Sequence, residues 1–134
     1  MNQLNKKLNL TPNKKEVGRN SVVSRRESVV KGINTQLLIC DSLLIDGEDY
    51  RDFNGRKVIS WFWLNEEGKY FLSINYGKKP IELSKGKFSV ICESLEEVKD
   101  SLNIIKETIL NGDLDKELEK RSKLIRSNFR KWII

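Results

Sequence analysis

The sequence predicts an α+β protein, in which an antiparallel sheet of about four strands is followed by a capped amphipathic helix, with additional helices near both ends. Turn signals at residues 54–55, 65–68 and 85–86 separate short segments rich in aromatic and β-branched residues, which is typical of strands. After residue 94 the apolar residues recur at spacings of three and four, which is typical of a helix. A length of 134 residues suits one domain with a modest core.

The first part of the chain differs in composition from the rest. Residues 1–18 are polar and basic, contain Pro12 and show no core periodicity, so they are predicted to form a flexible basic arm. The lysines of such an arm can still contact phosphates. Residues 19–134 are then the single folded domain.

A helix is expected to begin near residues 20–21. Ser24 and Glu27 have capping-box spacing and offer a later start. Gly32 weakens the helical pattern. The apolar residues of this helix share one side, namely Val22, Val29, Ile33 and Leu37.

The segment from residue 37 to 45 either continues this helix or forms a strand, and Asp46-Gly47 ends either one. Asn54-Gly55 then signals a two-residue hairpin, and Lys85-Gly86 marks another reversal. Strands are expected between the turns, near residues 56–64, 69–76, 80–84 and 87–92. A single antiparallel meander is the simplest topology.

A capping box formed by Ser94 and Glu97 begins the next predicted helix, which ends at Gly112. Its apolar face consists of Leu95, Val98, Leu102, Ile105 and Ile109. Asp113 can cap a last helix. The apolar face of that helix consists of Leu114, Leu118, Ile125, Phe129 and Trp132, and the basic side chains roughly opposite are Lys116, Lys120, Lys123, Arg126 and Arg130.

Two of the three tryptophans, Trp61 and Trp63, lie one residue apart in a predicted strand, so the length of the following turn decides which way they face. If residues 66–68 form a three-residue loop, Asn65 pairs with Lys69, Trp63 lies opposite Phe71 and Trp61 lies opposite Ser73. The core face then holds Phe62, Leu64, Tyr70, Leu72, Ile74 and Tyr76. The other face shows Trp61, Trp63, Lys69, Phe71, Ser73 and Asn75.

This outward set has the chemistry of a surface for unpaired bases. Aromatic rings provide stacking surfaces worth about 1–3 kcal/mol per base. Lys69 and Asn75 can reach phosphate groups or base edges. The neighbouring loops add the cations Arg56, Lys57, Lys78, Lys79, Lys85 and Lys87.

The same aromatic residues allow other arrangements. A loop with an even number of residues would turn Trp61 and Trp63 into the core beside Leu72 and Ile74. Helices on both faces of the sheet would bury both sets. The outer face could instead form a dimer contact, because exposed aromatic patches often mark protein interfaces.

The charges are segregated along the chain. The formal net charge is +6, which favours anionic partners and above all nucleic acid. Residues 1–40 hold eight Lys and Arg against two acids, and residues 120–134 hold six against none. Residues 93–119 hold nine acids against three Lys. Such segregation indicates that different faces meet different partners, although it can also arise by chance in a small protein.

Several function classes lack their residues. The chain has no histidine, and Cys40 and Cys92 are isolated, so a zinc site or a Cys/His nucleophile pair has no second member and the thiols are expected to be buried and free. The acids occupy helix positions without a compact catalytic pair, and no nucleotide-loop motif is present, so neither an enzyme nor a cofactor is expected. No apolar run approaches a membrane span and no signal peptide is visible, which predicts a cytoplasmic protein without membrane contact.

The order of strands and capped helix from Trp61 to Gly112 resembles Whirly and PUR-type units and the transcriptional coactivators that share their plan. This resemblance implies a compact, usually dimeric module that grips single-stranded DNA or RNA on a curved sheet. W-F-W at residues 61–63, Y-G at 76–77, L-S-K-G-K at 83–87, N-G-D-L-D at 111–115 and S-V-V-S-R-R at 21–26 are similar to a family of small phage and bacterial proteins without an assigned function. The segment from residue 36 to 51 departs from both patterns.

These observations predict a protein that binds single-stranded RNA or DNA with weak sequence preference, as a homodimer. Bases would stack on Trp61, Trp63 and Phe71, and the cations would neutralise phosphates. The remaining candidate contacts are Lys69, Asn75, Arg56, Lys57, Lys78, Lys79, Lys85, Lys87, Lys123, Arg126 and Arg130. The alternative is a non-enzymatic adaptor, encoded by a phage for example, that binds a host or phage protein through the aromatic patch.

Overall fold

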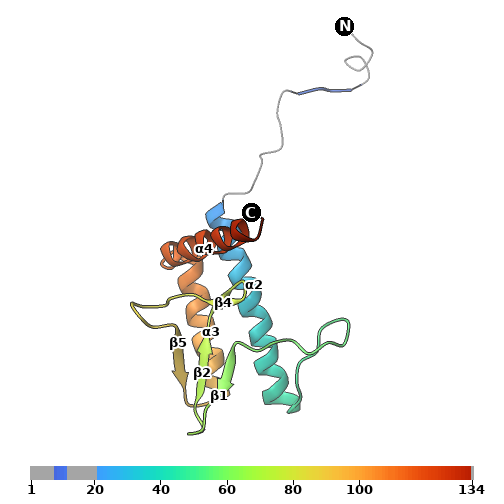
Figure 1. Ribbon diagram of the computed structural model, residues 1–134. Helices are drawn as coiled ribbons and strands as arrows, with labels where there is room; N and C mark the ends of the chain where they lie inside the picture. Colours follow the sequence, from blue (N-terminus) through green and yellow to red (C-terminus); the bar gives the residue numbers. More distant parts are fainter. Residues whose placement is uncertain (1–7, 12–20, 134) are drawn as a thin grey trace.

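The protein is an α+β domain in which helices pack on and beside a small antiparallel sheet (Figure 1). The computed structural model describes residues 8–11 and 21–133, with side chains described as far as residue 125, so the predicted arm lies mostly outside the described residues. The helical elements are α2 (Ser21–Asp41), the π-helical turn η1 (Ser42–Asp46), α3 (Leu95–Leu110) and α4 (Asp115–Ile133). The strands are β1 (Phe62–Leu64), β2 (Tyr70–Ser73), β3 (Asn75–Tyr76), β4 (Lys79–Pro80) and β5 (Ser89–Cys92).

Helix α2 is one long element that runs on into η1, so the segment that the sequence left open is helical. It ends at Gly47, whose φ of 66° is the left-handed conformation that glycine adopts readily. Val29, Ile33 and Cys40 are buried along its inner side. By length and composition alone, residues 21–46 could cross a membrane, which is weak evidence because the core helix of a soluble protein can meet the same criterion; about 28% of its apolar window is buried, and the helix contacts α3.

The predicted single meander is wrong in detail. The three-stranded sheet has the order β1-β2-β5, and β3 and β4 form a separate two-stranded hairpin. The reason is a break at Ile74, whose side chain is fully buried and which lies between β2 and β3. The β3–β4 hairpin thus leaves the sheet and packs against α2 and α4, and β2 pairs with β5 instead.

The first predicted strand, near residues 56–64, is mostly absent, since β1 covers only its last three residues. Asn54-Gly55 also lies in a turn of a different length from the predicted one. Asp52 N–H donates to Arg56 O, which closes a three-residue loop in place of the predicted two-residue loop. The Asp52 carboxylate favours this longer loop, because its Oδ1 accepts from the backbone N–H groups of Asn54 and Arg56 at 2.9 Å each.

The capped helix is confirmed. Ser94 Oγ accepts from Glu97 N–H at 3.2 Å, and Glu97 Oε2 accepts from Glu93 N–H at 2.6 Å, which is a capping box shifted by one residue on its return bond. Val98, Leu102 and Ile109 are fully buried, so the predicted apolar face is the one that packs. Helix α3 covers one face of the three-stranded sheet (Figure 1).

Helix α4 begins at Asp115, two residues after the predicted cap at Asp113. Its first turn is held to α2 by Arg26, which donates from Nε to Asp115 Oδ1 at 2.8 Å and from Nη2 to Oδ2 at 2.5 Å. This two-pronged hydrogen bond lowers the pKa of Asp115 below its ordinary value. Leu114 and Leu118 are buried beneath the helix, as predicted.

Both cysteines are buried and free, as expected. Burial raises the pKa of the Cys40 thiol to about 11 and also raises the pKa of Cys92. Cys92 lies 3.6 Å from Ser101 Oγ. Both thiols therefore stay protonated near neutral pH and act as small core side chains.

Candidate nucleic-acid interface

The turn that decides the direction of the aromatic residues has an odd number of residues, as the sequence predicts. Asn65 N–H donates to Lys69 O at 2.8 Å, and Asn65 Oδ1 accepts from the N–H groups of Glu67 and Lys69. Gly68 completes the loop with a φ of 82°. The register is then Phe62 with Leu72 and Trp63 with Phe71.

This register buries Phe62 and Leu72 on the side of the sheet that faces α3 and places Trp63 on the opposite side. Trp63 is 49% exposed. Its ring is stacked on that of Phe71, with centroids 5.8 Å apart and planes 19° from parallel. None of the described helices lies over this face of the sheet (Figure 1).

Strand β5 extends the aromatic pair into a row of three. Ile91 pairs with Phe71 and is 61% exposed. Trp63, Phe71 and Ile91 thus form one apolar row across all three strands, which we call the open sheet face. Its neighbours are polar, with the Lys69–Glu93 ion pair at 3.5 Å on the side of the 66–68 turn.

On the other side of the row, Ser73 pairs with Ser89. Ser73 is only 8% exposed, although the prediction placed it on the outer face. Its Oγ lies 3.1 Å from Asn75 Oδ1 and 3.3 Å from Trp61 O, which orders this end of the sheet. Asn75 is half-buried through the same contact, so its side chain is committed within the fold.

Trp61 does not join the open sheet face, which corrects the prediction for this residue. Its indole lies against Gly32 of α2, and its backbone N–H donates to the Gln36 Oε1 at 2.8 Å. Gln36 is buried and also donates to Ile59 O at 3.2 Å. Helix α2 therefore runs alongside the β1 edge of the sheet, and Trp61 fills the space between them (Figure 1).

The prediction of the core face also needs one correction. Leu64 alternates onto the same side as Phe62, yet it is 58% exposed because it is the last residue of β1 and extends past the end of the packed region. Tyr70 is half-buried and meets Phe62 edge to face, with centroids 6.3 Å apart. Tyr76 is also half-buried.

The close approach of Trp61 to α2 makes a specific prediction about Gly32. In an ordinary helix interior, Gly→Ala stabilises by about 1 kcal/mol. At Gly32 a β-carbon would overlap the Trp61 ring. We expect Gly32→Ala to lower the free energy of unfolding by about 1–3 kcal/mol in urea denaturation, because the indole has to move. Ser28→Ala, at an exposed position of the same helix, is the control. An equal or higher stability of Gly32→Ala would show that the indole does not pack there.

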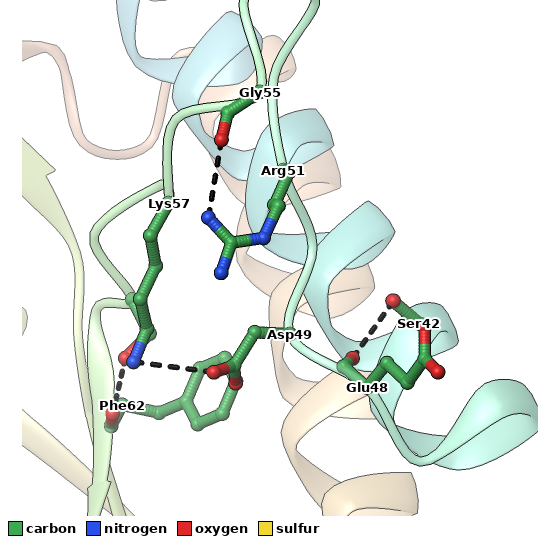
Figure 2. A network of polar contacts seen from close by, with 8 residues as sticks. Ser42, Glu48, Asp49, Arg51, Gly55, Lys57 and Phe62 are labelled. Carbon is green, nitrogen blue, oxygen red and sulfur yellow. Dashed lines mark hydrogen bonds and ion pairs between the residues drawn. The ribbon is translucent and has the colours of Figure 1, made fainter.

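The predicted cations with described side chains are exposed, apart from the half-buried Lys69, and three of them are paired. Lys57 Nζ lies 3.3 Å from Asp49 Oδ2 within the loop that links η1 to β1 (Figure 2). Lys69 pairs with Glu93, and Lys123 pairs with Glu119 at 3.3 Å. Within residues 21–125 the predicted cations without an ion-pair partner are Arg56, Lys78, Lys79, Lys85 and Lys87.

The loop of Figure 2 is held largely by its own polar groups. Arg51 Nη1 donates to Gly55 O at 3.1 Å, and Ser42 Oγ donates to Glu48 O at 2.8 Å. The loop contains acidic as well as basic side chains, so Arg56 and Lys57 lie among charges of both signs. The unpaired lysines cluster instead in residues 78–87, at the end of the sheet nearest α4. The side chains of Arg126 and Arg130 lie outside the described residues.

The sequence did not predict a groove of about 400 Å³ between α4 and the segment 79–88. Its apolar walls are Pro80, Ile81, Phe88 and Leu124. Its charged side chains are Lys79, Lys120 and Arg121, together with Glu82 and Glu117. We call this hollow the α4 groove. The turn at Lys85-Gly86 predicts the chain reversal beside Phe88. No feature of the local sequence predicts that α4 packs beside it.

Comparison with known proteins gives no guide to this site. No protein family matches the chain, and neither a curated protein nor a solved structure matches it. The candidate interface therefore stands on its geometry alone.

Proposed function

We propose that the protein binds single-stranded nucleic acid, with a base stacking against the aromatic pair on its open sheet face. The observation that carries this proposal is the stacked pair of the exposed Trp63 and the half-buried Phe71, on a sheet face that none of the described helices covers. Exposed apolar patches often mark interaction sites, and unpaired bases stack on aromatic rings irrespective of sequence.

A base can continue the stack that the two rings begin. Strands β1 and β2 hold the pair rigidly, because three residue pairs join them and the 66–68 turn closes with its own hydrogen bonds. Rings that are already ordered lose little rotamer freedom when a base arrives. Ile91 extends the platform by an apolar contact on the next strand. This arrangement favours weak sequence preference, since Asn75, the amide predicted to reach base edges, is held by Ser73 instead.

The cations supply the attraction to phosphates. Lys78, Lys79, Lys85 and Lys87 have no ion-pair partners among the described residues, so they can neutralise phosphates without breaking a contact. Lys69 would have to leave Glu93 or bind a phosphate beside it. A strand that passes from the aromatic row toward α4 would thus meet increasing positive charge, which favours that direction of binding.

Titration of fluorescent oligo-dT, oligo-rU and a duplex of equal length tests the proposal. We expect both single strands to bind better than the duplex, with an affinity that falls linearly in a log–log plot as salt rises. Tryptophan emission should be quenched on binding, because Trp63 stacks on a base. The absence of binding to any single strand at low salt would remove the proposal.

A second function is favoured by one observation. The row of Trp63, Phe71 and Ile91 is apolar, and the ion pair beside it carries no net charge. Such a surface also suits a protein partner or a second copy of the chain, and the homodimer predicted from the sequence would form in this way. Light scattering with and without an oligonucleotide decides between these uses. A dimer that buries the open sheet face should dissociate when the oligonucleotide binds, because the two compete for that face.

A further inference from the structure

We propose that the α4 groove is a second nucleotide site, in which an unstacked base lies against Phe88 and Leu124 and its phosphate binds Lys79 and Arg121. This inference rests on the proposed function and extends it from one stacking platform to two separate contacts on the same strand. It is carried by the shape of the groove, its apolar walls and the unequal pairing of its charges.

The groove is preformed by close contacts between α4 and the β3–β4 hairpin. Gly77, with a φ of 69°, lets Ile125 approach so closely that a β-carbon there would lie 3.3 Å from Ile125 Cδ1. Arg121 Nε donates to Tyr76 O at 3.4 Å. The buried Ile81 forms part of the wall. Binding therefore does not have to open the groove, and its volume of about 400 Å³ is within the range of small-ligand sites.

The charged side chains of the groove differ in whether they have partners within the fold. Glu82 Oε1 accepts from Gly86 N–H at 2.8 Å, and Glu117 Oε2 lies 3.9 Å from Lys120 Nζ. Glu117 is thus paired with a cation, whereas the Glu82 carboxylate is held by a backbone N–H group. Lys79 has no ion-pair partner among the described residues, and the terminal nitrogens of Arg121 donate to none of them. The groove is lined by three cationic and two acidic side chains, and this excess of positive charge favours an anionic ligand.

The walls require that this anion also carries an apolar or aromatic body. Phe88 is 44% exposed, and it lines the groove together with the exposed Leu124. Leu124 lies seven residues after Glu117, on the same side of α4. A nucleotide combines a flat base with a phosphate, which matches this pairing of walls and cations. Phe88 directly precedes Ser89, the first residue of β5, so the groove lies near the end of the sheet at which Ser73 pairs with Ser89.

Two measurements on the whole protein test the inference. In methyl NMR we expect thymidine monophosphate to shift the Ile81 and Leu124 signals, and to do so equally in Trp63→Ala, because the groove does not depend on the aromatic row. We also expect Phe88→Ala to weaken binding of a long oligo-dT about tenfold and to leave the shortest oligomer that binds Trp63 unaffected. Lys79→Ala should reduce the salt slope by about 1. Lys116→Ala, at an exposed position of α4 that does not line the groove and is not among the proposed phosphate contacts, is the matched control for charge.

The outcomes separate the two proposals. If oligonucleotides quench Trp63 but Phe88→Ala binds all lengths like the unchanged protein, the groove inference is wrong and the stacking proposal stands. If thymidine monophosphate shifts the groove methyls and no oligonucleotide affects Trp63, the open sheet face is not the nucleic-acid platform. If only an acidic peptide with apolar residues shifts the groove methyls, the groove is a protein-docking site and the inference is overturned.

Discussion

Trp63→Ala is expected to weaken binding of single-stranded oligonucleotides about 5- to 150-fold, the range that corresponds to about 1–3 kcal/mol for one stacked base. The residue is 49% exposed and its ring contacts Phe71, so its removal takes away stacking surface without opening a core cavity. The free energy of unfolding should fall by about 1 kcal/mol or less, which is the worth of one exposed aromatic pair. Fluorescence anisotropy and urea denaturation of the same variant measure the two effects.

Leu64→Ala is the matched control for this variant. Leu64 is the next residue of β1, it is 58% exposed, and it alternates onto the other side of the strand from Trp63. It should leave oligonucleotide affinity unchanged. Equal losses of affinity in both variants would show that the strand matters only for stability. A large loss of stability in Trp63→Ala would place the indole in a buried contact.

The direction of Trp63 was predictable because it depends on a local feature. Asn65 and Gly68 specify a three-residue loop, and the loop length alone fixes which residues pair and which side each faces. The capped helix α3 was predictable for the same reason, since Ser94 and Glu97 lie within its first turn. Both predictions used only residues that are near one another in the sequence.

Apart from the loop at residues 53–55, which the nearby Asp52 lengthens, the main errors concern contacts between distant segments. Trp61 alternates with Trp63 in the sequence, but Gly32 makes room for its indole on α2, and no spacing within the strand reveals that. The pairing of β2 with β5 depends on where the buried Ile74 interrupts the strand, because residues 75–88 then pack elsewhere. The α4 groove exists only where α4 meets residues 79–88. Its cations were visible in the sequence, but their common location was not.

Leu102→Ala should show the opposite pattern to Trp63→Ala, with a loss of about 2–5 kcal/mol in the free energy of unfolding. Leu102 is fully buried on α3, the helix that covers the inner face of the sheet. Domains of ordinary stability unfold at a cost of about 5–15 kcal/mol, so the variant should still fold in the cold. Its folded fraction should then bind oligonucleotides with normal affinity, because the open sheet face lies on the other side of the sheet.

Ile104→Ala provides the comparison within the same helix, since Ile104 lies two residues further on and is exposed. It should change stability by about 0.5 kcal/mol or less. If Leu102→Ala were no worse than Ile104→Ala, α3 would not be the helix that closes the core. The side of the sheet that carries Trp63 could then no longer be assigned as the open sheet face. A large loss from Leu102→Ala with retained affinity would instead separate the helix-covered face from the binding face by experiment.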